Sequence, residues 1–408
     1  MTAQCRFCGT PLGETLVDLG RHPISNAFPT AEEVANEARY PLVVKHCPAC
    51  HLVQAAHDIP PEAMFTPSYV YFSSMSVSWV AHARRYAETM IERFGLGPAS
   101  RVVEIASNDG YLLRHFLERG IPTLGVEPTD STAEVAEGLG IPVERAYFGK
   151  TVAEALVARG LSADLMAANN VLAHVPDIAD FVAGFATLLK PQGVATFEFP
   201  HLARLIEAVQ FDTIYHEHYS YLSLTAVVGI FAKAGLRVFD VEKLPTHGGS
   251  LRVYATAIAA AHPTTSAVAA ILAEEHAAGL DADTGYRGFG PRVDAAIRAF
   301  RAFLATARAE GKTVAGYGAA AKGNTFLNAC GVTADDMICV ADKAPSKQGR
   351  LLPGSHVPVV APEALDAARP DYIVILPWNL ETEIAAQLEH ARAWGARFVV
   401  AIPTTRVF

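Results

Sequence analysis

The sequence predicts an α/β protein of three parts: a doubly wound sheet ending in an antiparallel hairpin, a small metal-binding module before it, and a Rossmann-like α/β domain after it. Three observations predict this arrangement. Two pairs of closely spaced cysteines lie in the first 50 residues, short apolar runs alternate with helical stretches in the centre, and the alternation resumes after residue 310. Alternating strands and helices form parallel sheets through right-handed crossovers. We place the three parts at residues 1–75, 76–261 and 262–408.

Length and composition fit an ordered globular protein. The 408 residues suffice for two or three domains, 51% are hydrophobic and 18% are charged. A formal net charge of -9 argues against a general nucleic-acid binder, because contact with phosphate backbones needs a basic surface. No apolar run approaches the ~20 residues of a membrane span, and the N-terminus carries no basic-then-apolar signal. We expect a cytoplasmic monomer or weak homo-oligomer that binds a small molecule, with no nucleic acid or membrane partner.

Four of the six cysteines form two Cys-x-x-Cys pairs, Cys5 with Cys8 and Cys47 with Cys50. Each pair lets two thiolates point at one ion, and two pairs complete the tetrahedral sulfur set that zinc prefers. Four thiolates leave no open coordination position, so the pattern predicts a structural zinc ion rather than a catalytic one. Redox-active or incidental cysteines are the alternative.

Near the end of the central part, the alternation of strands and helices gives way to two consecutive strands. Alternating runs at 237–244 and 250–255 flank a short His-Gly-Gly turn and predict an antiparallel hairpin. Class I methyltransferases add such a hairpin to the dinucleotide-binding design, and nicotinamide dehydrogenases typically lack it. Before the hairpin, four apolar runs separated by amphipathic helical stretches predict parallel strands, at 101–105, 123–126, 163–168 and 194–199.

A tight loop after the first strand is expected to face a ligand. The strand ends in Glu104, and Ala106 and Asn108 stand where a dinucleotide-binding loop has glycines, so that Gly110 alone remains. With few glycines and no lysine, this loop is a poor cradle for a pyrophosphate, and it suits a nucleoside without phosphates such as S-adenosylmethionine. Glu127, at the end of the second strand, can accept both ribose hydroxyls of an adenosine. A solvated strand-end carboxylate is the alternative for Glu127.

Polar residues at two other places are predicted to complete this cofactor site. Asn169 and Asn170 lie at the carboxyl end of a central strand, where ligands bind in doubly wound sheets, and His174 follows them. His174 could equally be a packed loop histidine. Tyr71 and Ser74 belong to a stretch of aromatic and hydroxyl residues suited to a sulfonium amino acid, although such a stretch is more often a loop packed on the core.

The densest cluster of acid–base groups spans residues 211–221. Histidine titrates near neutrality, so a histidine beside a carboxylate can act as a base. Removal of a proton from a carbon next to a ketone would give an enolate that attacks an electrophilic methyl group. On this hypothesis Tyr215 donates to the enolate oxygen, and Glu217 orients the base or shares its role. A metal-binding His-x-His pair and a purely structural polar loop are the alternatives.

A second loop, at the start of the C-terminal domain, has the glycines that the first one lacks. Gly316 and Gly318 follow a strand and precede a helix that contains Lys322, as phosphate binding requires, although the spacing is not that of a Walker loop. The next strand ends in a basic loop. Together these loops predict a pocket for a diphosphate, with solvated charged turns as the alternative. The side chains assigned to it are Lys322, Asn324, Asp342, Lys347 and Arg350.

Taken in order, these motifs resemble one family, the three-domain C-methyltransferases that depend on S-adenosylmethionine and methylate nucleotide-linked deoxysugars. The resemblance covers essentially the whole chain, through the cysteine pairs, the loop at 103–110, the Tyr-x-Glu-His segment, the His-Gly-Gly turn and the second glycine loop. It implies methylation at C3 of a TDP-4-keto-deoxysugar, with His218 as the base and a C-terminal domain that helps to hold the nucleotide. The other residues to which it assigns catalytic or cofactor roles are Tyr215, Glu217, Tyr71, Ser74 and Glu127.

Three other functions compete with this one. An NAD(P)-dependent oxidoreductase is the main alternative, and the glycine-poor first loop and the terminal hairpin argue against it. A C-methyltransferase acting on a non-sugar activated ketone is the second. A non-catalytic module that binds zinc and a nucleotide is the third, and it has no use for the Tyr-x-Glu-His segment.

Overall fold

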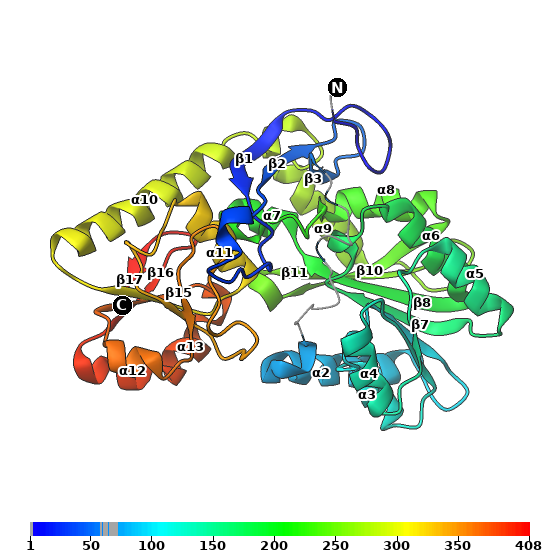
Figure 1. Cartoon of the computed structure of the whole chain (residues 1–408). Helices are drawn as coiled ribbons and strands as arrows, with labels where there is room; N and C mark the ends of the chain where they lie inside the picture. The colour runs from blue at the N-terminus through cyan, green and yellow to red at the C-terminus, as the bar shows by residue number, and fades with distance from the viewer. Residues whose placement is uncertain (1–2, 58, 60–63, 65–71) are drawn as a thin grey trace.

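The computed structural model describes residues 3–57, 59, 64 and 72–408. Within these residues the strands form a four-stranded, a seven-stranded and a six-stranded sheet. Figure 1 shows the seven-stranded sheet on one side of the molecule and the six-stranded sheet on the other, with the N-terminal strands above and between them. The predicted fold class, a doubly wound sheet with a small module before it and an α/β domain after it, is confirmed.

The seven-stranded sheet has the strand order β10-β11-β8-β7-β4-β5-β6. Its strands from β8 to β6 pair in parallel, whereas β11 runs antiparallel to both β8 and β10. The predicted hairpin is therefore present, and its second strand joins the sheet beside β8, as in class I methyltransferases. The strands are β4 (Val102–Ile105), β5 (Thr123–Val126), β6 (Val143–Glu144), β7 (Ala163–Asn169), β8 (Leu189–Pro200), β10 (Leu236–Leu244) and β11 (Ser250–Ala257).

Helices cover both faces of this sheet, because its central strands are apolar on both sides; all four residues of β4 are buried. Apolar residues of α2, α3 and α4 pack on one face, and those of α5, α6 and α8 on the other. Ser76 begins α2 by accepting the N–H of Trp79, and Gly95 in the left-handed conformation ends it. The helices are α2 (Val77–Phe94), α3 (Leu113–Leu117), α4 (Asp130–Gly138), α5 (Lys150–Ala158), α6 (Ile178–Leu188), α7 (Leu202–Glu207) and α8 (Leu224–Lys233).

The six-stranded sheet has the order β14-β13-β12-β15-β16-β17 and is parallel except for β17, which runs antiparallel to β16. Its strands are β12 (Val314–Tyr317), β13 (Val340–Ala341), β14 (Val359–Val360), β15 (Tyr372–Ile375), β16 (Arg397–Val400) and β17 (Arg406–Val407). The helices after the central sheet are α9 (Ser266–Ala277), α10 (Phe289–Ala309), α11 (Ala321–Ala329), α12 (Ala364–Ala368) and α13 (Glu381–Gln387).

The four-stranded sheet contains a strand that the sequence does not predict. Three of its strands come from the N-terminal module: β1 (Thr15–His22), β2 (Tyr40–His46) and β3 (Val53–Ala55). The fourth, β9 (Ser220–Tyr221), comes from the end of the acid–base cluster and pairs antiparallel with β3. The N-terminal module is thus joined by backbone hydrogen bonds to the segment of the central domain that carries His218.

An apolar cluster crosses all three parts of the chain. It includes Val44 of β2, Phe211 of the central part, Phe300 of α10 and Phe326 of α11. The ring centroid of Phe326 lies 5.8 Å from that of Phe211 and 4.8 Å from that of Phe300. Because the parts share this core, the divisions after residues 75 and 261 stay predictions.

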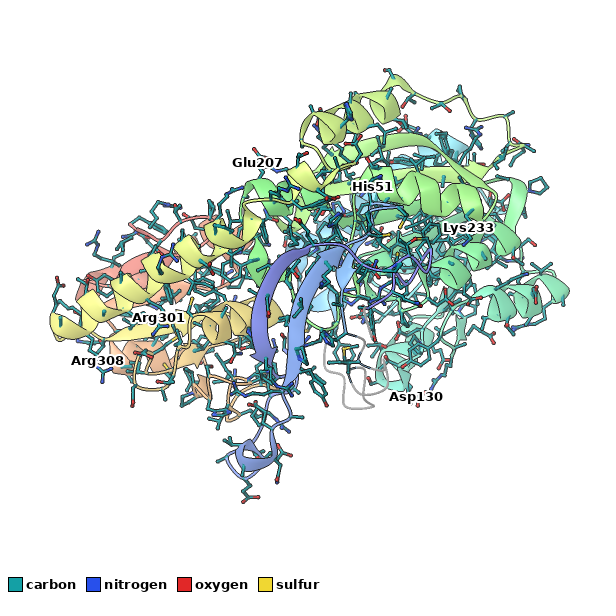
Figure 2. All side chains as sticks on the ribbon, turned by 90° about the horizontal axis from the view of Figure 1, so that it is seen from above. His51, Asp130, Glu207, Lys233, Arg301 and Arg308 are labelled. Atoms are coloured by element: carbon teal, nitrogen blue, oxygen red, sulfur yellow. The ribbon has the colours of Figure 1, made fainter. Side chains whose placement is uncertain are left out.

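The outer helices present charged residues to solvent. Seen from above, Arg301 and Arg308 lie along α10 at one end of the molecule, while Lys233 and Asp130 lie at the opposite end (Figure 2). Among the helices of the described residues, none is both long and apolar enough to cross a membrane.

A buried carboxylate in α9 holds the starts of two other helices. Glu275 is 1% exposed, and one of its oxygens accepts a hydrogen bond from His201, which precedes α7. At the start of α8, the carboxylate also accepts from the backbone N–H of Leu224 and from both the backbone N–H and the hydroxyl of Thr225. Burial opposes ionisation of Glu275, but the hydrogen bonds from His201 and Thr225 outweigh it and lower its pKa. The carboxylate therefore joins α7, α8 and α9.

Replacement of Glu275 with alanine should lower the free energy of unfolding by about 3 to 5 kcal/mol, because interior donors would lose their acceptor. The matched control is Glu274→Ala, since Glu274 is exposed and pairs with Lys243 at the surface, an ion pair worth about 0 to 1 kcal/mol. Urea unfolding would measure both variants. Equal losses would show that the buried carboxylate does not stabilise these helices.

Candidate active site

The loop after β4 has an unusual backbone. Ala106 (φ +53°), Asn108 (φ +50°) and Gly110 (φ +78°) all adopt the left-handed conformation, which non-glycine residues rarely do. Glu127 holds this loop: its carboxylate accepts the N–H of Asn108 and that of Thr129, each at 2.9 Å. Strained backbone of this kind is common where a loop meets a ligand. Each oxygen of Glu127 keeps a further lone pair for the ribose hydroxyls assigned to it.

The segment before α2 lies against the same loop. The N–H of Ser73 donates to Asn108 Oδ1 at 2.9 Å, and the N–H of Ser74 donates to Asp109 Oδ2 at 3.1 Å. The side chain of Ser74 is exposed. Tyr71, also assigned to the cofactor, lies outside the described residues. This segment is therefore close enough to the loop for the cofactor contacts predicted for Ser74.

Buried acceptors without a partner gather around the loop. Within the described residues, Glu104 Oε2, Asp109 Oδ1, Asn169 Oδ1 and Asn170 Oδ1 have no hydrogen-bond donor. Tyr111 links the side chains of Glu104 and Asn169, and burial raises the pKa of Glu104 well above its usual range although Tyr111 opposes this. Unpaired buried acceptors are costly, so such a site favours a ligand that brings donors or positive charge. The ammonium and sulfonium groups of S-adenosylmethionine meet this requirement.

The ring of His218 is buried and its tautomer is defined. Its Nδ1 lies 2.8 Å from the carbonyl oxygen of Thr213. A carbonyl can only accept, so Nδ1 carries the proton and Nε2 keeps its lone pair. Burial holds the pKa of His218 well below 6.5, and the positive charge of the nearby Lys322 acts in the same direction. The imidazole is therefore neutral at neutral pH, as a general base must be before the reaction.

Tyr215 contacts the ring of His218, whereas the side chain of Glu217 is bonded to the N-terminal module. The ring of Tyr215 lies 4.0 Å from that of His218, centroid to centroid. Glu217 is buried, and its Oε1 accepts a hydrogen bond of 2.7 Å from Asn26 of the N-terminal module. Burial raises the pKa of Glu217 to about 7, although Asn26 opposes the shift. Residues 215–218 therefore carry a neutral histidine in contact with a phenol, and a buried carboxyl group that titrates near neutrality.

Two further histidines lie near His218 and near the polar residues that follow β7. His174 packs edge-on against His218, with 4.6 Å between ring centroids, and burial lowers the pKa of His174 to about 4. His247, in the turn between β10 and β11, lies with its Nε2 3.1 Å from Asn170 Nδ2. Asn170 (φ +57°) and His247 (φ +54°) both adopt the left-handed conformation. Trp79 of α2 lies between this turn and the loop after β4, with its ring 5.4 Å from His247 and 6.0 Å from Tyr111.

Of the residues assigned to the diphosphate, Lys322 lies near enough to Asp212 and His218 for its charge to act on both. Its ammonium lies over the ring of Trp378 and donates to Asn379 Oδ1 at 2.5 Å, and its charge acts on His218. The other four have partners inside the protein, and their substrate contacts stay predictions. Asn324 donates to the Ser25 carbonyl, Asp342 accepts from Ala319 N–H, Lys347 donates to the Ala319 carbonyl, and Arg350 donates to the Phe28 carbonyl.

Several residues of this site were not predicted from the sequence. Asn26 had no signal, because it pairs with Glu217 across 191 residues. Asp212 lies within the predicted acid–base cluster but received no role. Trp378 and Asn379 follow β15, whose carboxyl end adjoins that of β12, so the position of these strands in a parallel sheet is a signal that could have identified them.

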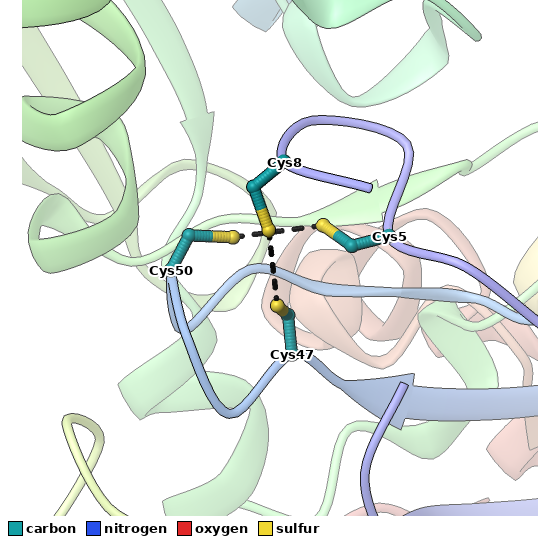
Figure 3. A group of neighbouring side chains, drawn as sticks. All are labelled: Cys5, Cys8, Cys47 and Cys50. Atoms are coloured by element: carbon teal, nitrogen blue, oxygen red, sulfur yellow. Dashed lines mark hydrogen bonds between the residues drawn. The ribbon is translucent and has the colours of Figure 1, made fainter. Parts of the chain in front are cut away.

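The four cysteines of the N-terminal module form one cluster (Figure 3). Their sulfur atoms all lie within 4.8 Å of one another, with Cys5 and Cys50 3.5 Å apart and Cys8 and Cys47 3.4 Å apart. A tetrahedral zinc ion with bonds of about 2.3 Å separates its sulfurs by roughly 3.8 Å. The cluster therefore fits zinc, and the distances are too long for disulfides.

The cysteine cluster is connected through β3 to the segment that carries His218. Gln54 of β3 donates its side-chain N–H to Cys5 Sγ at 3.2 Å and accepts the N–H of Arg6 at 2.9 Å. The backbone of the same residue pairs with Ser220 of β9, two residues after His218. A structural ion in the module would thus stabilise the strand against which the catalytic segment is held.

Comparison with known proteins gives one match for each part. A family model for a zinc binding domain covers residues 5–65, one for a methyltransferase domain covers 79–241, and one for a C-methyltransferase C-terminal domain covers 245–403. The chain is 37% identical over 405 residues to the C-methyltransferase NovU of Streptomyces niveus, covering 99% of this chain and 96% of that protein. These matches do not favour the oxidoreductase alternative.

Two more distant matches each cover less than half of the chain. The ubiquinone biosynthesis O-methyltransferase of Burkholderia mallei (strain ATCC 23344) is 26% identical over 203 residues, which cover 46% of this chain and 81% of that protein. The solved structure of an S-adenosylmethionine dependent methyltransferase from Mesorhizobium loti is 17% identical and covers 45% of this chain and 98% of that one, with a TM-score of 0.34.

Metal analysis should find one zinc ion per chain, and Cys47→Ser should lose it because three thiolates and a hydroxyl bind zinc less tightly than four thiolates. The same variant should have a lower melting temperature. Cys339→Ser is the control, since Cys339 is a buried cysteine outside the cluster. Full zinc content in Cys47→Ser would contradict the assignment of the ligands.

Proposed function

The chain belongs to the S-adenosylmethionine-dependent C-methyltransferases with an N-terminal zinc-binding domain, and from this we propose that it methylates C3 of a TDP-4-keto-deoxysugar after His218 has removed the proton from that carbon. One observation carries this proposal. The buried ring of His218 donates through Nδ1 to the Thr213 carbonyl, so that Nε2 is left as an unprotonated base.

The protonation of His218 suits this task. The C–H next to a ketone is weakly acidic, and its removal leaves negative charge on the ketone oxygen. The neutral ring accepts the proton at Nε2 while the Thr213 carbonyl continues to accept from Nδ1. The low pKa of the free site works against this transfer, but the forming enolate favours the charged imidazole and raises that pKa as the proton moves. The base therefore gains strength as negative charge develops on the substrate.

We assign supporting roles to Tyr215 and Glu217. Tyr215 lies against the ring of His218, where its hydroxyl can donate to the ketone oxygen. With a pKa of about 7, Glu217 can hold or release a proton at neutral pH. The bond from Asn26 fixes its carboxyl group. We assign Tyr215 to the stabilisation of the enolate and Glu217 to a second proton-transfer role.

Bound S-adenosylmethionine supplies an electrophilic methyl group. The chain provides Glu127 for the ribose hydroxyls and the unpaired acceptors of Glu104, Asp109 and Asn169 for the cationic end of the cofactor. Asn170 adjoins both this site and His247. These residues would hold the methyl group on the side of the site where the base forms the enolate.

Lys322 is the residue that we assign to the diphosphate. The protein is acidic overall, so an anionic substrate must be met by local cations. Lys322 is half-buried, which makes its charge more effective than that of a solvated lysine, and its charge acts on His218. A diphosphate near Lys322 would place the sugar that it carries beside His218.

Replacement of His218 with glutamine should slow methyl transfer by about 100- to 10,000-fold, because the general base is lost. The same variant should lose exchange of the C3 hydrogen of a TDP-4-keto-deoxysugar with deuterated water, followed by NMR in the presence of S-adenosylhomocysteine. His390→Gln, at an exposed histidine of the C-terminal domain, is the control. Exchange at the normal rate in His218→Gln would place the base elsewhere.

Lys322→Gln should weaken the binding of TDP by about 10- to 100-fold, the range expected for loss of a charged hydrogen bond, and leave S-adenosylhomocysteine binding unchanged. Lys343→Gln removes an exposed lysine from the neighbouring loop and should change neither affinity. Isothermal titration would measure both ligands. TDP binding that is equally strong in the two variants would argue against the assignment of Lys322.

A further inference from the structure

Three consecutive residues of the C-terminal domain contact three parts of the active site. Pro377, Trp378 and Asn379 follow β15, and η7 (Trp378–Leu380) begins among them. Pro377 packs on the second glycine loop so closely that a Cβ atom at Gly318 would lie 2.4 Å from its Cγ. Asn379 accepts from Lys322. We call residues 377–379 the clamp, because they touch elements of two domains.

Trp378 is the residue through which the clamp contacts the central domain. Its Nε1–H donates to Asp212 Oδ2 at 2.7 Å. Its ring lies on the turn η5 (Thr246–Gly248), where a Cβ atom at Gly248 would be 2.3 Å from Cη2 of the indole. Gly248 also has a positive φ of +89°, so both the space and the backbone require glycine there. The clamp therefore depends on a close approach between the two domains.

Asp212 is the residue that receives this contact. It is 1% exposed, and among the described residues its Oδ1 has no hydrogen-bond partner. Burial raises its pKa to about 6, although the charge of Lys322 and the hydrogen bond from Trp378 oppose the shift. A buried carboxyl group with an unpaired oxygen is costly unless another role retains it. The indole N–H is thus an important part of the environment of Asp212.

The position of Asp212 explains what the contact can control. Asp212 lies in the turn η4 (Phe211–Thr213), whose last carbonyl accepts from His218 Nδ1. Gln210, which precedes the turn, holds its beginning. The carbonyl of Gln210 accepts from the hydroxyl of Thr213, and its side chain donates to the Gly248 carbonyl. The clamp and the His247 turn therefore hold η4 from two sides.

We propose that Trp378 and Asp212 are positioning residues for the catalytic base: the hydrogen bond from the indole to the carboxylate fixes η4, so that the Thr213 carbonyl keeps His218 in the Nδ1–H tautomer with Nε2 facing the substrate. This inference rests on the proposed function in taking His218 as the base. It makes the C-terminal domain part of the catalytic centre as well as a holder of the nucleotide. When Trp378 loses its N–H, η4 relaxes and the inactive Nε2–H tautomer gains population.

Trp378→Phe tests the proposal, because it removes the N–H and keeps an aromatic ring against Gly248. We expect kcat to fall about tenfold, the effect of one lost hydrogen bond, with the KM for either substrate changed by less than about threefold. The matched control is Trp394→Phe, which removes an indole N–H bonded to the Pro370 carbonyl in the same domain. A kcat for Trp378→Phe equal to that of Trp394→Phe would overturn the proposal.

The tautomer itself provides a readout that a general loss of packing would not move. The full-length protein with nitrogen-15-labelled histidine, compared with His218→Gln for assignment, should show the Nδ1–H form of His218 in the wild type and in Trp394→Phe. Trp378→Phe should show an increased Nε2–H population. An unchanged tautomer would overturn the proposal even with reduced activity. An active His218→Gln variant would instead overturn the proposed base and leave the tautomer result standing.

A double-mutant cycle closes the test. Asp212→Ala and Trp378→Phe remove the two partners of one bond, so the double variant should be no slower than the slower single variant. Asp212→Asn keeps an acceptor oxygen for the indole and should recover most of the activity lost in Asp212→Ala. Additive losses, or no recovery in Asp212→Asn, would show that the two residues act separately.

Discussion

The burial of a polar segment is the constraint on which this structure depends. Residues 211–221 carry a carboxyl pair, two histidines and three tyrosines, yet all but Tyr215 are buried. Buried polar groups need partners, and one domain does not supply enough of them. Asn26 comes from the N-terminal module, Trp378 comes from the C-terminal domain, and β3 supplies the backbone partners of β9. The three parts are held together because each satisfies a different section of the same segment.

The same burial determines the protonation states of the ionisable groups in the site. In a medium of low dielectric constant the neutral form of each group is favoured, so histidine pKa values fall and carboxyl pKa values rise. His174 and His247 have pKa values of about 4, whereas Glu217 is raised to about 7. The free site therefore holds neutral bases beside a carboxyl group near its titration point. With the proposed anionic substrate, this balance would move in favour of a protonated histidine, and the strength of the proposed base would depend on the presence of substrate.

Which parts of the fold and of the candidate site could be predicted from the sequence depends on how far apart in the chain the interacting residues lie. The parallel sheet, the terminal hairpin, the cysteine cluster and the loop held by Glu127 have local signatures, because strand periodicity and residue spacing lie within short stretches. The pairing of β3 with β9 has no such signature, since β9 is two residues long. Asn26 with Glu217 and Asp212 with Trp378 are separated by 191 and 166 residues. Such contacts depend on how the domains pack, which no local pattern of residues specifies.

The size and the contacts of the N-terminal module explain why it contains a zinc-binding cluster. The N-terminal module is too small to form a large core of its own, because a domain of about 60 residues buries only about 60% of its surface, and metal binding adds folding free energy. Its strands must nevertheless be rigid, because Gln54 joins the cysteine cluster to β9 and Asn26 must reach Glu217. A flexible module would leave the carboxyl group of Glu217 buried without its donor. Rigidity supplied by the ion is therefore transmitted to the segment that carries His218 through the pairing of β3 with β9 and through Asn26.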